Sequence, residues 1–145
     1  MKEKLKKDWF GRTKSIEELH NDSRLWISNI NFIIDETRFL KRLLSTNYID
    51  CLEAGLFKKI ENFVQKLSTE KKKAKTLLLL IQEHENTLNC LIKSNSVLSN
   101  INFTETHKKL EKEIVVFTKI NKRLKKQIFE IVEQVMHKKH QKKLS

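Results

Sequence analysis

The sequence predicts an all-α protein, an antiparallel up-down-up bundle of three long helices. The first observation is composition, because the 145 residues include no Pro and only two Gly. This leaves almost no residues for the tight turns of a β-sandwich, a barrel or a βα alternation. The second is periodicity, because apolar residues recur at alternating spacings of three and four over long segments, which is typical of helices that pack along a seam. A chain of this length can also bury a core without disulfides or a structural metal.

The first helix is predicted to begin after Ser15. Glu18 follows Ser15 by three residues, the spacing of a capping box, in which each side chain binds the backbone amide of the other residue. A heptad seam then continues to a predicted end around residues 45–48. The seam residues are Leu19, Ser23, Trp26, Ile30, Ile33, Thr37, Leu40 and Leu44.

The second helix is predicted to open at residues 50–53, which have a cap-like spacing, although Gly55 weakens its first turns. No residue between 68 and 75 forces a break, so one helix of roughly 40 residues is preferred. The alternative is a break near Ser68, which would give four helices. The predicted seam contains one lysine and one glutamate among apolar residues: Phe57, Ile60, Val64, Leu67, Lys71, Ala74, Leu78, Ile81, Glu85, Leu88 and Ile92.

Residues 94–103 are predicted to form a loop, because they are rich in turn-forming polar residues and lack a helical period. Val97, Leu98 and Phe103 are expected to cover the end of the core, and Thr104 is the expected N-cap of the third helix. Because both connections are short, the helices should be antiparallel neighbours. The seam of the third helix is His107, Leu110, Ile114, Phe117, Asn121, Leu124, Ile128, Ile131 and Val135.

The whole chain, residues 1–145, is predicted to be one domain with basic ends at residues 1–14 and 137–145. It carries 30 Lys and Arg against 18 Asp and Glu, a formal net charge of +12. Such a charge can attract nucleic acid or an anionic membrane without sequence specificity. Lys, Ile and Asn also share AT-rich codons, so nucleotide composition is an alternative source of the excess. No recognition-helix or zinc-finger pattern indicates sequence-specific reading of nucleic acid.

A cytoplasmic protein without enzymatic activity is expected. The charged start is followed by no apolar stretch of signal-peptide length, and the longest apolar run, residues 77–81, is far shorter than the roughly 20 residues of a membrane span. Cys51 and Cys90 are expected to be free thiols. With so few glycines the chain lacks phosphate-binding loops, and neither cysteine has a histidine at a spacing that defines a nucleophile and its base.

The first helix carries more apolar residues than a core-facing stripe needs. Phe32, Phe39 and Leu43 lie outside its seam. The leading hypothesis is therefore a helical bundle that uses these residues as an interface, either in a homo-oligomer or with a helical protein partner. The alternative is that this helix is simply more enclosed than its neighbours, or that the residues are scattered over the surface and need no explanation.

Three histidines lie on or beside apolar faces: His20, His84 and His107. In an up-down-up bundle they share one end, so their imidazoles are expected to cluster. Imidazole nitrogen binds Zn, Cu, Fe or Ni, and Glu111 can add an oxygen. A metal-binding bundle is therefore the second hypothesis, and separate hydrogen-bonded histidines are the alternative. The chain loosely resembles metal-binding four-helix bundles of the hemerythrin kind, in helicity and histidines only, because the ligand motifs of those proteins are absent.

Overall fold

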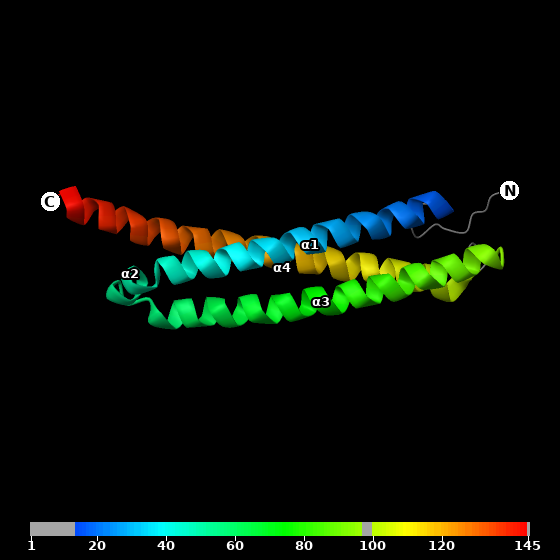
Figure 1. Ribbon diagram of the computed structural model, residues 1–145, viewed down its shortest axis with the longest axis horizontal. Coiled ribbons are helices and arrows are strands. Elements are labelled where there is room, and N and C mark those ends of the chain that lie inside the picture. Colours follow the sequence, from blue (N-terminus) through cyan, green and yellow to red (C-terminus); the bar gives the residue numbers. More distant parts are fainter. Residues whose placement is uncertain (1–13, 97–99, 145) are drawn as a thin grey trace.

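The computed structural model describes residues 14–96 and 100–144, the last three of them for the backbone alone. Within that range it contains no strand and four helices, α1 (Ile16–Thr46), α2 (Tyr48–Glu53), α3 (Phe57–Lys93) and α4 (Ile101–Leu144). Figure 1 shows the three long helices side by side in an elongated rod, with α2 at the turn between α1 and α3. The predicted all-α bundle of three long helices is confirmed.

Helix α1 begins where the sequence predicts. The Ser15 hydroxyl accepts the backbone N–H of Glu18 at 3.1 Å, and the Glu18 carboxylate accepts the backbone N–H of Ser15 at 2.9 Å. Both halves of the capping box are thus formed. All eight predicted seam residues of α1 are buried, and the helix ends at Thr46, within the predicted range.

A short helix with a tight end connects α1 to α3. The backbone N–H of Leu56 bonds the carbonyl of Cys51 at 2.9 Å, and the N–H of Gly55 bonds the carbonyl of Leu52 at 3.0 Å. This pair of bonds is a Schellman motif, which requires a left-handed residue after the helix. Gly55 takes that place with a φ of +75°, and α2 therefore stops after six residues.

The predicted opening of the second long helix at residues 50–53 is therefore wrong. Those residues belong to α2, and α3 begins at Phe57. Four helices do form, but the break lies at residues 54–56 and not near Ser68, where α3 continues without interruption. The reason is the left-handed Gly55, which ends the hydrogen-bond ladder of one helix before the next can begin.

Helix α4 begins earlier than predicted. The Asn100 side-chain oxygen accepts the backbone N–H of Phe103 at 2.7 Å, so Asn100 acts as the cap in place of the expected Thr104, and Ile101 is already helical. Phe103 is buried, as expected for a residue that covers the core end. The other two residues expected there, Val97 and Leu98, lie outside the described residues. All nine predicted seam residues of α4 are buried.

The buried face of α3 lies one residue away from part of the predicted seam. Phe63, Glu70, Leu77 and His84 are buried where Val64, Lys71, Leu78 and Glu85 were expected. Leu77 simply fills the core. The two polar residues are accommodated because each has a partner inside the bundle: Asn121 donates to the Glu70 carboxylate at 3.1 Å, and His84 meets a histidine of α4.

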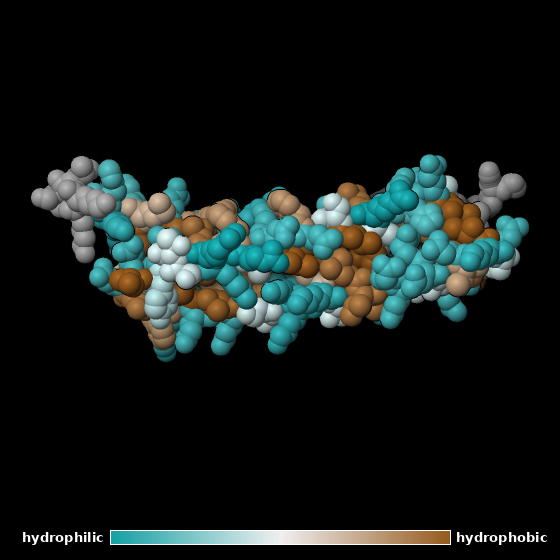
Figure 2. Space-filling view, in the orientation of Figure 1, coloured by the Kyte–Doolittle hydropathy of each residue, from teal (hydrophilic) through white to brown (hydrophobic). Residues whose placement is uncertain are grey.

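The core follows the length of the rod in three clusters of apolar side chains. The cluster nearest α2 joins all four helices, the middle one surrounds Ile30 and Ile81, and the smallest, at the opposite end, contains Leu19, Leu88 and Phe103. Figure 2 shows apolar patches between hydrophilic side chains on the visible face. None of the described helices combines the length and the apolar character that crossing a membrane requires.

Candidate functional site: a buried histidine pair beside an apolar groove

Polar side chains meet inside the bundle at the end where α1 and α4 begin and α3 ends (Figure 1). Asp22 comes from α1, His84 from α3 and His107 from α4. The Nε2 atom of His107 lies 2.9 Å from the Oδ2 atom of Asp22, and its Nδ1 atom lies 2.8 Å from Nε2 of His84. We call this series of hydrogen bonds, which joins the three long helices, the Asp22–His107–His84 chain.

The carboxylate of Asp22 determines which ring nitrogens carry protons. Its Oδ2 atom also accepts the Lys14 ammonium at 2.6 Å, so this oxygen is an acceptor and His107 donates from Nε2. The Nδ1 atom of neutral His107 is then a lone-pair acceptor, and it receives the Nε2–H of His84. It follows that Nδ1 of His84 carries no proton.

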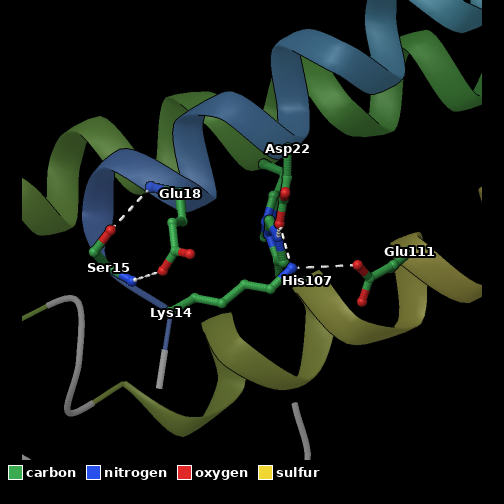
Figure 3. Close-up of polar contacts among 7 residues, drawn as sticks. Lys14, Ser15, Glu18, Asp22, His107 and Glu111 are labelled. Carbon is green, nitrogen blue, oxygen red and sulfur yellow. Dashed lines mark hydrogen bonds and ion pairs between the residues drawn. The ribbon is translucent and has the colours of Figure 1, made fainter. Parts of the chain in front are cut away.

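Lys14 connects the segment before α1 to α4. Figure 3 shows its side chain extending toward Asp22 and Glu111, and the ammonium lies 2.6 Å from the first carboxylate and 3.3 Å from the second. Burial alone would lower the pKa of Lys14, but the hydrogen bond to Asp22 and the two negative charges together raise the Lys14 pKa above 10.5. Lys14 is therefore a fixed positive charge paired with Asp22.

The two histidines are neutral at pH 7. His84 is 4% exposed and His107 is fully buried. Burial, with a smaller contribution from His107, lowers the pKa of His84 from 6.5 to about 4. Burial also lowers the pKa of His107, and the hydrogen bond to Asp22 opposes this effect without cancelling it. The Asp22–His107–His84 chain therefore contains two uncharged imidazoles beside the ion pair of Lys14 and Asp22.

Aromatic rings cover the faces of both imidazoles. Phe103 stacks on His84 with 4.2 Å between ring centroids and 2° between ring planes. Trp26 lies against His107 at 4.7 Å in a tilted arrangement. These contacts fix the orientation of the rings and leave the ring edges for hydrogen bonding.

The other predicted metal ligands have different partners. His20 Nδ1 lies 2.9 Å from the carboxylate of Glu85, and Glu111 faces Lys14. The facing nitrogens of His84 and His107 are 2.8 Å apart, whereas two nitrogens on one tetrahedral Zn would be roughly 3.3 Å apart, given Zn–N bonds near 2.0–2.1 Å. Across residues 14–96 and 100–144 no group of three or more His, Cys, Asp or Glu side chains is arranged to hold a metal ion.

Beside the histidines, two recesses lie between α3 and α4. The first, which we call the α3/α4 groove, has a volume of about 670 Å³ and is lined by Thr69, Lys72, Lys73, Thr76, Leu77, Leu80, Lys112, Glu113, Val116, Phe117 and Ile120. The second, which we call the His84 pocket, has a volume of about 340 Å³ and is lined by Leu80, Glu83, His84, Thr87, Asn100, Asn102, Phe103, Thr106 and Leu110. Leu80 belongs to both, so the pocket continues the groove toward the end of the bundle.

The predicted interface residues of α1 divide into two kinds. Phe32 is 61% exposed and Phe39 is 47% exposed. Leu43 instead is partly buried against the core cluster nearest α2. Phe39 contacts Phe129 of α4 edge to face, with 6.4 Å between ring centroids. The exposed rings therefore lie beside the junction of α1 and α4, on a surface that does not include the α3/α4 groove.

Sequence reasoning found the two histidines but missed three of their partners. Asp22 and Lys14 look like ordinary solvated charges at the start of a helix, and Phe103 was expected only to cover the core end. The available signal was spacing, because Asp22 lies one residue before the buried Ser23 and thus at the edge of the seam. Which charged residue at a seam edge turns inward depends on the register between helices, and a single sequence does not give that register.

Comparison with protein-family models, with curated proteins and with solved structures found no match.

Proposed function

We propose that this protein binds an amphipathic helix of another protein in the α3/α4 groove. The observation that carries the proposal is an elongated apolar recess with lysines at its edges, between two long antiparallel helices. A helix laid into such a recess would complete a four-helix bundle, which is a common and stable packing of helices.

The floor of the groove supports an apolar contact. Leu77 and Phe117 are buried and form its base, while Leu80 and Val116 are exposed above them. Helix-binding grooves take apolar side chains of their partner at helical spacing, and burial of those side chains supplies most of the affinity. Exposed apolar side chains that flank a concave surface are typical of a site that a partner covers.

The charge at the edges supports an acidic partner. Lys72 and Lys73 on α3 and Lys112 on α4 line the groove, and Glu113 is the one acidic residue among its lining residues. A helix with an apolar face and glutamate or aspartate beside that face would place its carboxylates near these ammonium groups. Such pairs steer association and select the partner more than they raise affinity.

Peptide binding tests the proposal. An acidic amphipathic peptide of about 20 residues, long enough to be partly helical, is labelled and titrated with the full chain, and a lysine-containing counterpart is the comparison. We expect micromolar binding of the acidic peptide, a free energy near −8 kcal/mol, and at least tenfold weaker binding of the basic one. Equal binding of both peptides, or of neither, would contradict the proposal.

The neighbouring valines of α4 provide a matched pair of variants. Val116 lines the groove and Val115 does not, and both are about half exposed. Val116→Asp should weaken binding of the acidic peptide about tenfold or more, a loss of about 1.4 kcal/mol or more, because it places a carboxylate on the apolar lining of the groove and near the peptide's own negative charges. Val115→Asp should leave the affinity unchanged. Similar losses in both variants would show that the groove is not the binding surface.

Self-association through α1 is a second candidate function. The specific observation is that Phe32 and Phe39 remain exposed in the single chain, one heptad apart on one side of α1. Exposed apolar residues at this spacing are typical of a helix that packs along a second helix.

A further inference from the structure

The His84 pocket combines apolar walls with one hydrogen-bond acceptor. Leu80, Phe103 and Leu110 supply apolar surface, and Thr87, Asn102 and Thr106 add hydroxyl and amide groups. Among the described residues the Nδ1 atom of His84 has no hydrogen-bond partner, whereas its Nε2 atom is occupied by His107. Because His84 lines the pocket, a ligand bound there is the natural partner for this nitrogen.

The Asp22–His107–His84 chain gives that nitrogen a defined polarity. The acceptor oxygen of Asp22 makes His107 donate from Nε2, and His107 in turn makes His84 donate from Nε2. Nδ1 of His84 is left as a lone pair that accepts a proton donor and repels another acceptor. Phe103, stacked on the ring, opposes a rotation of the imidazole that would replace Nδ1 by a ring C–H.

We propose that the His84 pocket binds a hydroxyl-bearing aromatic ring, such as a tyrosine side chain of the docked helix, whose O–H donates to Nδ1 of His84. The ring would contact the apolar walls, and the hydroxyl would satisfy the acceptor. A carboxylate is excluded by the lone pair and by Glu83 at the pocket. An ammonium group has no apolar surface to match Phe103 and Leu110.

The identification of the occupant as a partner's side chain rests on the proposed function, because the pocket continues the α3/α4 groove through Leu80. A helix in the groove would carry one of its side chains over the pocket. A site built to hydrogen-bond a ligand hydroxyl disfavours a ligand that lacks this donor. The pocket would therefore select which amphipathic helices bind, while the groove supplies the general affinity.

The first measurement determines the tautomer of His84. Two-dimensional ¹H–¹⁵N NMR spectra of the histidine rings at pH 7 distinguish protonated from unprotonated ring nitrogens. We expect His84 to carry its proton on Nε2 and a lone pair on Nδ1. A His84 ring protonated on Nδ1 would overturn the proposal, because the pocket would then present a donor.

The second measurement compares two small probes, phenol and anisole, by chemical-shift titration of the full chain. Anisole has the same ring, but a methyl group replaces the hydroxyl proton. We expect phenol to shift the resonances of Thr106 and Asn102 and to bind about tenfold more tightly than anisole. This ratio corresponds to a hydrogen bond whose net contribution is at the upper end of the usual range. Equal affinity of the two probes would overturn the proposal.

His84→Phe is the test variant, because a phenylalanine ring can still stack on Phe103 but accepts no hydrogen bond. The control is His137→Phe, at an exposed histidine. The preference for phenol should vanish in the first variant and persist in the second. If His84→Phe fails to fold, the His84 tautomer and the ratio of phenol to anisole affinity in the unmodified chain still test the proposal. If phenol binds more tightly than anisole but the acidic peptide does not bind, the helix-binding function of the groove is contradicted and the pocket's preference for a hydroxyl stands. If the acidic peptide binds but phenol and anisole bind equally, only the proposal for the pocket is contradicted.

Discussion

At the scale of single residues, the histidine pair makes the protein sensitive to acid. His84 has a pKa of about 4 when folded and about 6.5 when unfolded. Between these values the unfolded chain binds a proton that the folded chain does not, so stability falls as the pH falls from about 6.5 to about 4. Above pH 6.5 both states are neutral at this residue and it makes no contribution. His107, whose pKa is also lowered, adds to the loss.

We therefore predict that acid lowers the free energy of unfolding by about 3 kcal/mol through His84 alone, the energy equivalent of its pKa shift. Urea denaturation at pH 7 and at pH 4 measures this change. Because other groups of the protein also bind protons over this range, the His84 contribution is the difference between the unmodified chain and His84→Phe. Identical pH dependence of these two proteins would show that His84 is freely protonated in the folded state.

At the scale of elements, the end of α2 depends on one left-handed residue. Gly55 has a φ of +75°, and a Cβ atom added there would meet no neighbour within 4 Å. Any penalty of a substitution is therefore backbone strain and not a clash. Gly55→Ala should lower the free energy of unfolding by about 1 kcal/mol, because L residues other than Asn and Asp rarely adopt this conformation.

Chemical denaturation of Gly55→Ala and Gly55→Asn checks this prediction. Asparagine tolerates the left-handed conformation, so it should cost less than alanine at the same position. A variant with alanine that is as stable as the unmodified chain would mean that the Schellman turn after α2 is not needed to hold α1 and α3 in place.

The elements also show how far the sequence predicts the structure. In α1 and α4 every seam position that the regular heptad predicted is buried, although α4 buries Val132 as well. In α3 polar residues stand side by side at two places, Glu70 beside Lys71 and His84 beside Glu85. Apolar spacing alone could not decide which residue of each pair faces the core. The decision came from partners on other helices, Asn121 and His107. The same dependence on partners hid the roles of Asp22 and Lys14 at the site.

At the scale of the whole molecule, the exposed rings of α1 predict self-association. Light scattering at high micromolar concentration should detect a dimer or larger oligomer, and Phe32→Ser together with Phe39→Ser should shift the protein toward the monomer. Because both rings are about half exposed or more, these changes should leave the stability of the single chain within about 1 kcal/mol. A monomer at every concentration would remove this second function.

The charge of the whole molecule predicts a separate, weak attraction to polyanions. Four basic residues of α4 are exposed within two turns, Lys119, Lys122, Arg123 and Lys126. Fluorescence anisotropy should detect binding to a short DNA duplex in low salt and its near loss by about 0.15 M salt, because the affinity comes from released counterions. Docking of the acidic peptide, which rests on apolar burial, should decline far less. Salt-independent DNA binding would contradict a purely electrostatic contact.

The rod shape determines how this protein diffuses. Helix α4 has 44 residues and is therefore about 66 Å long at 1.5 Å per residue, with two long helices packed alongside it (Figure 1). A rod sweeps out a larger sphere than a compact protein of equal mass, so a single chain should leave a gel-filtration column early, at the position of a heavier globular protein. Its end-over-end rotation should also be slower than rotation about its long axis, which would give fluorescence depolarisation two correlation times.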